Sequence, residues 1–377
     1  MTVPVRYHLG KFPPEELDWS RLIPLIGPAN AGLARYDGLL AAIPNAHVLL
    51  SPLITQEAVL SSKIEGTQVT IGEVLEIEAG GHSERITQTK RDDAEEVRNY
   101  RQAMRACQKE LELRPLSQQI LRTAHQMLMQ GVRGRDKFPG YYRTDQNWIG
   151  PAGCTMEEAR FVPIPPEHLQ QGMDHWDVYL GDTSHTSSSD TLVQTAIIHA
   201  EFEALHPFKD GNGRLGRMLI PLFLYQRKLL SSPDFYISGY LDAHRDVYQE
   251  RLRAVSRDGD WTGWCAFFLK GIQKQSEENE TKARNILALH DWIKHQVTKL
   301  TRSQYAIKAV DFIFQTPIFS TTNFINHADI PRPTASRILT LLRNAGLLVS
   351  LVEGRGRRSG IYAFRELLNV TEGQEVF

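Results

Sequence analysis

The chain has 377 residues, of which 41% are apolar and 23% are charged, and its formal net charge is −1. This composition excludes a mainly disordered chain, and the length favours two or three domains over one. A net charge near zero excludes long-range attraction of the whole molecule to nucleic acid or to an acidic membrane, so any such attraction must be local.

The cysteines and the apolar runs limit the compartment in which the protein works. Cys107, Cys154 and Cys265 lie far apart in the sequence and predict neither a disulfide framework nor a zinc site. The N-terminus lacks the apolar segment of a secretory signal, and the longest apolar run, 218–225, is interrupted by Pro221 and is too short to span a membrane. These features predict a reduced, cytoplasmic protein with no membrane partner.

The first third of the chain has a helical pattern. Apolar residues recur every three or four positions over 49–64, and Gly66 indicates the end of that helix. Further helices are expected at 92–113 and 117–129. We therefore predict an N-terminal helical region over residues 1–115.

Glycines and aromatic residues then replace the helical pattern. Residues 140–149 are rich in strand formers, turn-forming residues occupy 150–153, and a second short strand is expected around Arg160, Phe161 and Val162. These segments predict a small β-hairpin flap. An exposed strand edge at 160–162 would bind an extended segment of a partner protein through main-chain hydrogen bonds.

Helices return after the hairpin and continue to about residue 300. The pattern predicts them at 174–180, 191–205, 215–227, 244–255 and 261–272. The highly charged stretch that follows keeps a helical period and predicts a connecting helix. The expected organisation is a core at 116–272, the connecting helix at 273–300 and a smaller domain at 301–377.

The densest group of chemically reactive residues is the stretch 206–217, His-Pro-Phe-Lys-Asp-Gly-Asn-Gly-Arg-Leu-Gly-Arg. His206 ends an apolar helix, because Pro207 prevents the helix from continuing normally. Asp210 is a hard oxygen ligand of the kind that suits Mg²⁺, which takes one or two carboxylates together with substrate phosphates.

The second half of this stretch has the features of an anion site. Gly211 and Gly213 permit close backbone approach to a ligand, and their amides, with that of Asn212, come just before a helical run. Arg214 and Arg217 share a helix face, where two guanidinium groups suit a polyphosphate. Each feature alone has an ordinary structural interpretation, but their combination within one short stretch predicts an active site.

The same stretch resembles the signature of the Fic family, His-Pro-Phe-x-Asp/Glu-Gly-Asn-Gly-Arg-x-x-Arg, at every fixed position, and the resemblance extends over roughly 45–270. It implies a mainly α fold, with a Fic helical core and a small β-hairpin flap. It also implies a protein adenylyltransferase that moves AMP from ATP to Tyr, Ser or Thr hydroxyls of proteins, itself among the candidates, and releases pyrophosphate. His206 would accept the proton of the incoming hydroxyl.

The resemblance also assigns the nucleotide contacts. It implies Mg²⁺ on Asp210, while residues along the loop would hold the phosphates of ATP: Gly211, Asn212, Gly213, Arg214 and Arg217. Fic relatives of the Doc type, which phosphorylate, have a bulkier lysine-containing loop, so Gly213 favours adenylyl transfer. Adenine would lie against the later helices, where Tyr248 is the expected contact.

A second motif resembles a built-in inhibitor. Ser61 and Glu65 lie four residues apart and share a helix face. The segment Ser-Ser-Lys-Ile-Glu-Gly resembles the inhibitory motif Ser/Thr-x-x-x-Glu-Gly/Asn of many Fic proteins. By that resemblance Glu65 would pair with Arg217 and compete with the γ-phosphate, while Ser61 would form a hydrogen bond within the active site. Whether this chain also removes AMP stays open.

Residues 301–377 predict a small domain with its own pattern. Helices are expected at 305–314, 319–328 and 334–345, followed by strands at 347–352 and 361–364. Three helices and a hairpin whose tip, 353–360, carries arginines resemble a winged helix-turn-helix.

The partner of this domain is left open by the sequence. The third helix leaves four polar residues for solvent or a ligand: Arg337, Thr340, Arg343 and Asn344. Nine Lys and Arg against six Asp and Glu give the segment a net charge of only +3, a thin footprint for DNA. Winged helices also bind proteins, so DNA binding, homodimer formation and target docking remain alternatives.

Two other functions stay open at this point. The chain would be a DNA-binding regulator if the Fic core served as a nucleotide sensor, although a sensor has no need of His206. The core would also suit Fic-type transfer of another phosphate-linked group, such as phosphocholine or uridylyl.

Overall fold

The structure is a computed structural model that describes residues 3–43, 45–81, 86–131, 136–182, 190–354 and 359–376. The chain forms two compact units, each assembled from separate stretches. Unit 1 comprises residues 1–37, 60–65 and 98–277, and unit 2 comprises residues 38–59, 66–97 and 278–377. None of the described helices is both long enough and apolar enough to cross a membrane.

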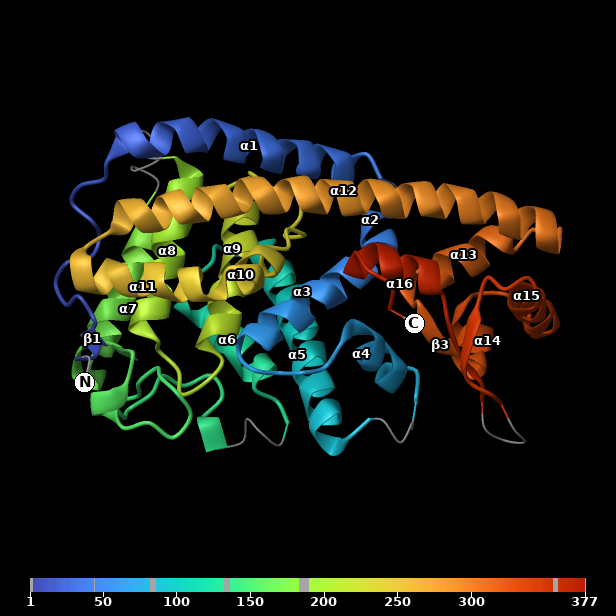
Figure 1. The fold of residues 1–377 in the computed structure, drawn as a ribbon, viewed down its shortest axis with the longest axis horizontal. Helices are drawn as coiled ribbons and strands as arrows, with labels where there is room; N and C mark the ends of the chain where they lie inside the picture. The colour runs from blue at the N-terminus through green and yellow to red at the C-terminus, as the bar shows by residue number, and fades with distance from the viewer. Residues whose placement is uncertain are drawn as a thin grey trace. The chain divides into compact units, whose positions relative to one another are not determined.

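The fold is mainly α, with two small sheets (Figure 1). The helices are α1 (Trp19–Ala41), α2 (Ala46–Leu49), α3 (Ser51–Ile64), α4 (Ile71–Glu78), α5 (Gln88–Leu111), α6 (Gln118–Leu128), α7 (Pro166–Gly181), α8 (Thr191–Leu205), α9 (Asn212–Gln226), α10 (Ser238–Ala243), α11 (Arg245–Asp258), α12 (Trp261–Thr301), α13 (Ala306–Gln315), α14 (Thr321–His327), α15 (Arg332–Asn344) and α16 (Arg365–Glu372). The strands are β1 (Val5–Arg6), β2 (Phe161–Val162), β3 (Ile318–Ser320), β4 (Val349–Val352) and β5 (Ile361–Ala363).

Helices α8 and α9 form the centre of unit 1. Nearly every residue of α8 is buried, which fits a helix whose sequence is apolar on all sides. Two tryptophan side chains bind its backbone: Trp176 of α7 donates to Ile198 O and Trp264 of α12 donates to Ala196 O. The side chain of Asp190 caps the first turn of α8 by accepting the N–H of Leu192 at 2.8 Å. This central pair supports the loop that joins α8 to α9.

Helix α12 is longer than the sequence pattern predicts. The helix expected at 261–272 and the connecting helix expected at 273–300 form one continuous helix. A pair of opposite charges one turn apart, Arg284 and Glu280, supports its charged part. Within unit 1 it lies beside α1 (Figure 1), where a side chain at Gly32 would come within 3.3 Å of the Ser276 Cβ.

The predicted hairpin is largely wrong. Residues 140–148 form turns and bends, and only Ile149 bridges to Phe161. Strand β2 instead pairs in parallel with β1 from the N-terminus. The edge that the sequence predicts to be exposed is therefore occupied on both sides, and Phe161 and Val162 are buried. Arg160 is exposed, although its N–H donates to Ile149 O.

Residues just after β1 hold the N-terminal segment in place. The Tyr7 hydroxyl donates to Glu201 on α8 at 2.6 Å, and His8 contacts the other oxygen of the same carboxylate at 2.9 Å. This explains why a strand of two residues persists: side-chain bonds to a buried helix supplement a very short ladder.

At its C-terminal end, the described part of unit 2 contains four helices, α13 to α16, and a three-stranded antiparallel sheet. The helices α13, α14 and α15 lie close to the predicted positions, and the strand order is β3-β5-β4. Strand β3 and helix α16 were not predicted from the sequence. Phe312, Phe319 and Phe324 pack together, with ring centroids 5.2–5.5 Å apart. Helix α4 contacts β3 and helix α2 contacts α13.

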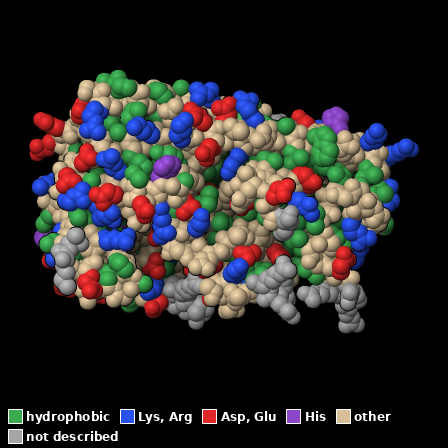
Figure 2. All heavy atoms as spheres, in the orientation of Figure 1, with side chains coloured by type: hydrophobic (Ala, Val, Ile, Leu, Met, Phe, Trp, Pro, Cys, Tyr) green, Lys and Arg blue, Asp and Glu red, His purple; other side chains and the backbone are tan. Residues whose placement is uncertain are grey.

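The surface expected to carry a ligand is only partly described. Arg337, Thr340, Arg343 and Asn344 of α15 are exposed, as their spacing predicts. Arginines 355, 357 and 358 of the expected basic tip lie outside the described residues. On the face drawn in Figure 2, basic and acidic side chains are interspersed, which fits the net charge of −1.

Candidate active site

The loop between α8 and α9 is held in a strained turn. His206 adopts a left-handed conformation with φ 49° and ψ 58° at the end of α8, and Gly211 has φ 77° just before α9. A left-handed conformation costs a residue other than glycine roughly 1–2 kcal/mol, so contacts around His206 must hold it. Within the loop, the Asn212 side chain accepts the N–H of Phe208 and donates to its carbonyl.

The His206 imidazole is prepared to act as a base. Its Nδ1 lies 3.3 Å from the Glu203 carbonyl, which can only accept, so Nδ1 carries the proton and Nε2 keeps its lone pair. Burial lowers the pKa of His206 to about 4, although the carboxylates of Glu65 and Asp210 oppose that effect. The ring is therefore neutral at physiological pH.

The start of α9 carries the amides that the sequence analysis predicts to bind phosphate. The helix begins at Asn212, earlier than its apolar pattern predicts. The amides of its first turn have no partners within the helix, as at any helix N-terminus. The N–H of Gly211, which the sequence analysis predicts to bind phosphate, instead donates to the side-chain carboxylate of Asp210 at 2.6 Å. The same carboxylate lies 3.6 Å from Arg214, which is 4% exposed. Carboxylate, helix terminus and guanidinium are thus adjacent.

Arg217 is buried and binds both the last turn of α3 and the residue that follows it. Its Nε donates to Ser61 Oγ at 2.9 Å, and its Nη2 donates to Ser61 O at 2.8 Å and to Glu65 at 2.6 Å. Burial opposes ionisation of the Glu65 carboxyl, but Arg217 outweighs it, so the pKa of Glu65 is below its usual value. Glu65 is therefore an anion paired with Arg217.

The Glu65 carboxylate also covers Gly213. A Cβ at position 213 would lie 2.1 Å from Glu65 Oε1 and 3.0 Å from an Arg217 nitrogen. The absence of a side chain there is what lets the carboxylate approach the first turn of α9. Glu65 thus occupies the place next to the helix terminus and Arg217 where an anionic ligand would bind.

Two contacts from α10 and α11 hold the end of α3. Lys63 forms an ion pair with Asp242 at 2.7 Å, and Arg245 donates to Ile64 O at 2.5 Å. Capping of the last carbonyls by a basic side chain stabilises a helix end. These contacts flank Glu65 and fix the backbone from which it reaches Arg217.

A cavity of about 440 Å³ joins the predicted residues. His206, Glu65, Gly213, Arg217 and Tyr248 all line it. Its other walls come from the end of α3, from the segment around β2 and from α8 and α11: Ile64, Trp148, Ile149, Gly150, Pro151, Arg160, Phe161, Ala200, Glu203, Ala204, Arg245, Gln249, Leu252 and Arg253. Among the residues predicted for the site, Asp210, Gly211, Asn212, Arg214, Ser61 and Val162 do not line this cavity.

Tyr248 is held by a buried histidine that the sequence interpretation did not single out. The Tyr248 hydroxyl lies 2.9 Å from His199 Nε2, and His199 Nδ1 lies 2.8 Å from Gly216 O. Because Gly216 O only accepts, Nδ1 donates to it and Nε2 accepts the tyrosine proton. The hydroxyl is thus engaged within the protein, and the ring is the part available to the cavity.

Glu203 is a second residue that the sequence interpretation missed. One of its oxygens, Oε1, is buried and has no hydrogen-bond partner within the described parts of the chain. Burial raises the pKa of Glu203 to about 7, with Arg217 opposing and Glu65 adding to that effect. The sequence did contain a signal for this residue, because Glu203 is a carboxylate within the apolar helix that ends at His206.

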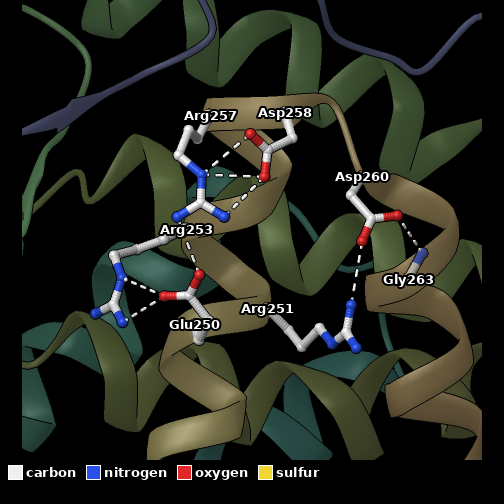
Figure 3. A network of polar contacts seen from close by, with 7 residues as sticks. All are labelled: Glu250, Arg251, Arg253, Arg257, Asp258, Asp260 and Gly263. Atoms are coloured by element: carbon white, nitrogen blue, oxygen red, sulfur yellow. Dashed lines mark hydrogen bonds and ion pairs between the residues drawn. The ribbon is translucent and has the colours of Figure 1, made fainter.

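A polar network fixes the outer face of α11 (Figure 3). Glu250 accepts hydrogen bonds from Arg253 at 2.7 Å and from Arg257 at 3.0 Å. At the start of α12, Asp260 accepts from Arg251 and from the N–H of Gly263. Arg253, which lines the cavity, is therefore held by its own helix.

No cluster of three or more His, Cys, Asp or Glu side chains suited to a metal lies among the described residues. Asp210 stands as a single carboxylate whose side chain is 49% exposed. One exposed carboxylate beside a helix N-terminus suits Mg²⁺, which takes most of its remaining ligands from substrate and water. It does not suit a structural zinc ion.

Two family models match the chain: Fic/DOC family N-terminal over residues 23–109, and Fic/DOC family over residues 115–224. Protein adenylyltransferase fic-1 of Caenorhabditis elegans is 34% identical over 85 residues, which are 22% of this chain and 15% of that protein. A probable protein adenylyltransferase of Aquifex aeolicus is 28% identical over 121 residues, which are 31% of this chain and 33% of that protein. The matches thus span at most a third of these relatives' lengths.

Solved structures extend the likeness at the level of fold. A Fic family protein from Desulfovibrio desulfuricans G20 has a TM-score of 0.58 at 19% identity, covering 93% of this chain and 98% of that one. Fic-1 of C. elegans (residues 134–508) has a TM-score of 0.52 at 20% identity, covering 71% of this chain and 74% of that one.

Proposed function

This chain belongs to the Fic/DOC family, and we propose that it is a protein adenylyltransferase that Glu65 holds inactive. It would transfer AMP from ATP to a Tyr, Ser or Thr hydroxyl of a protein and release pyrophosphate. The observation that carries this proposal is the arrangement of one neutral histidine, one helix terminus and two buried arginines in a single site.

The residues of the site support the steps of this reaction. His206 Nε2 would take the proton of the attacking hydroxyl, which a neutral imidazole can do. The amides at the start of α9, with Arg214, would hold the phosphates and stabilise the charge that develops on them. Mg²⁺ bound with the nucleotide would be held by Asp210 and would offset the negative charge on the phosphates.

The pairing of Glu65 with Arg217 supports inhibition by competition. The carboxylate occupies the guanidinium that would bind the γ-phosphate, at 2.6 Å. ATP that binds without this contact would place its α-phosphorus away from the attacking oxygen. A small misplacement of reacting atoms costs about 100-fold in rate.

Replacing Glu65 tests this function directly. ATP labelled on its α-phosphate is incubated with Mg²⁺, cell extract and either the wild type or Glu65→Gly. We expect strong labelling of protein by the variant and little by the wild type, and none by Glu65→Gly combined with His206→Ala. Equal labelling by wild type and Glu65→Gly would falsify the inhibitory role.

The mass added to the acceptor distinguishes the enzymatic alternatives. AMP, UMP and phosphocholine add different masses to a hydroxyl, so mass spectrometry of the modified peptide identifies the group. Self-modification is separated from modification of a target by omitting the extract.

We also propose that residues 301–377 form a winged helix-turn-helix module. Three helices, the sheet order β3-β5-β4 and the exposed polar face of α15 support this. The basic side chains on that face favour DNA as a candidate partner and a nucleotide-sensing regulator as the second candidate function. Binding of duplex DNA that is lost with Arg343→Ala supports this; concentration-dependent dimerisation with no DNA binding supports a protein interface instead.

A further inference from the structure

Arg143 is a buried arginine that the proposed reaction does not use. It is 3% exposed, and no carboxylate forms an ion pair with it among the residues the structure describes. Burial lowers the pKa of Arg143 to about 10, so it stays charged at neutral pH. Burying a charge without an opposite charge is costly, and such a residue needs hydrogen bonds that compensate.

The guanidinium of Arg143 makes all of its bonds to backbone carbonyls. Nε donates to His206 O at 2.9 Å, and Nη2 donates to Leu205 O at 3.3 Å. The remaining bonds reach Asp145 O at 3.1 Å and Ile164 O at 2.5 Å. The backbone N–H of Arg143 also donates to Pro207 O at 2.9 Å. One residue therefore binds three consecutive carbonyls across the turn at His206.

The next carbonyls of the loop are held in the same manner. Phe208 O accepts from the side chains of Asn147 at 3.2 Å and Asn212 at 2.8 Å. Asp210 O accepts from His125 at 3.0 Å. The carbonyls at 205–208 and 210 are thus occupied by donors of the protein.

This arrangement explains two features of the loop. The last carbonyls of a helix have no partners within it, and Pro207 prevents the helix from continuing past His206. Arg143 supplies those partners and so offsets the strain of a left-handed histidine. The backbone N–H of Arg143 bonds to Pro207 O, so it is not available to a strand ladder within 140–148.

We propose that Arg143 is a positioning residue for His206, which holds the imidazole in its reactive orientation by binding the carbonyls of Leu205, His206 and Pro207. The proposal deepens the function proposed above and rests on it. Arg143 need not touch ATP or the acceptor hydroxyl, since its contacts are all with the backbone of the turn and its neighbours.

The charge of Arg143 has a second effect, on the pKa of His206, that can be separated from its hydrogen bonds. Burial and the charge of Arg143 both favour the neutral His206 ring, whereas the bond to the Glu203 carbonyl and the carboxylates of Glu65 and Asp210 favour the protonated ring. Loss of its charge raises the pKa of His206, while loss of its hydrogen bonds alone does not. Gln and Lys at position 143 therefore separate the two effects.

The test uses the full chain in the Glu65→Gly background, with Arg143→Gln and Arg143→Lys. Arg227→Gln is the matched control, because Arg227 also donates to backbone carbonyls, but to those of Leu180 and Asp182, which lie outside the turn at His206. Thermal unfolding checks that each variant is folded, and calorimetry gives its affinity for ATP. The rate of AMP transfer is then measured against ATP concentration and pH.

Both Arg143 variants should lower kcat by about 10- to 100-fold while the KM and Kd for ATP change by less than about threefold. The acidic limb of the pH–rate profile should move to higher pH in Arg143→Gln and stay in place in Arg143→Lys. Arg227→Gln should retain the parent's kcat. The proposal is overturned if kcat is unchanged in both variants, or if its loss follows weaker ATP binding or unfolding.

Titration of His206 by NMR, without Mg²⁺ or ATP, keeps this test independent of the proposed function. If Glu65→Gly transfers no AMP, the adenylyltransferase proposal fails on its own. The pKa of His206 should nevertheless rise in Arg143→Gln relative to the parent. An unchanged pKa would overturn the effect of Arg143 on His206 even in an active enzyme.

Discussion

Glu65 and Arg217 form an ion pair of 2.6 Å in which the arginine side chain is 1% exposed and the glutamate side chain is 39% exposed. Arg217 also keeps two bonds to Ser61, so it stays in place if the pair opens. Opening of the pair would therefore need only a rotation of the Glu65 side chain toward solvent, which would free the guanidinium. The inhibition that we propose would therefore be reversible without rearrangement of the fold.

The first prediction concerns the stability of Glu65→Gly. Removing Glu65 leaves the buried Arg217 without its counter-charge, which typically destabilises a protein by about 3–5 kcal/mol. The variant should melt at a lower temperature than the wild type without ligand, and Mg-ATP should raise its Tm more than that of the wild type. Differential scanning fluorimetry measures both. A larger Mg-ATP shift in the wild type would contradict competition at Arg217.

A second prediction follows from the contact between Glu65 and Gly213. In Gly213→Ala the new methyl group would meet both Glu65 and Arg217, so the pair cannot keep its geometry. The methyl group also fills the space over the first turn of α9, so ATP affinity should fall about tenfold or more in the wild type and in Glu65→Gly. Calorimetry with Mg-ATP checks this. Unchanged affinity in Glu65→Gly/Gly213→Ala would place the phosphates elsewhere.

Local sequence information predicts the elements around the site well. Helix α8 begins at Thr191 and ends at Leu205, as predicted, because Asp190 caps its start and Pro207 follows its end. Residue types and spacing in 206–217 predict a site, and His206, Gly213 and Arg217 of this stretch line one cavity. The proximity of Glu65 to Arg217 came only from resemblance to a family.

Non-local pairing could not be predicted from local pattern. Strand β1 pairs with β2 across about 150 residues of chain. Strands of two residues are too short to show the alternation of apolar and polar residues by which a strand is predicted. The role of Arg143 was hidden for a similar reason: the fold brings its five carbonyl acceptors together, and an arginine in an aromatic segment is typical of a strand. Residues 60–65 belong to unit 1, while the residues on either side of them belong to unit 2. A division of the chain into consecutive ranges cannot describe such an arrangement.

The third prediction concerns acid stability through His199. Burial lowers the pKa of His199 to about 3, whereas an unfolded histidine titrates near 6.5. Below about pH 6.5 the unfolded chain binds a proton that the folded chain does not, so stability is fully present above that pH and falls as the pH drops. The expected contribution is about 1.4 kcal/mol per pH unit.

Denaturant unfolding between pH 7.5 and pH 5 measures this slope. His199→Gln should reduce it, and His175→Gln, at an exposed position, serves as the control. A slope that is the same in His199→Gln and in the wild type would show that His199 does not titrate between the two states.

The last prediction separates the two parts of Tyr248. Its hydroxyl donates to His199, so Tyr248→Phe leaves a buried acceptor without a partner and should lower the free energy of unfolding by about 1–3 kcal/mol. The ring still lines the cavity, so the affinity for Mg-ATP should stay within about twofold of the parent. Tyr225→Phe, whose hydroxyl has no hydrogen-bond partner within the described chain, is the control for loss of a hydroxyl. Weaker ATP binding with unchanged stability in Tyr248→Phe would mean that the hydroxyl contacts the nucleotide and not His199.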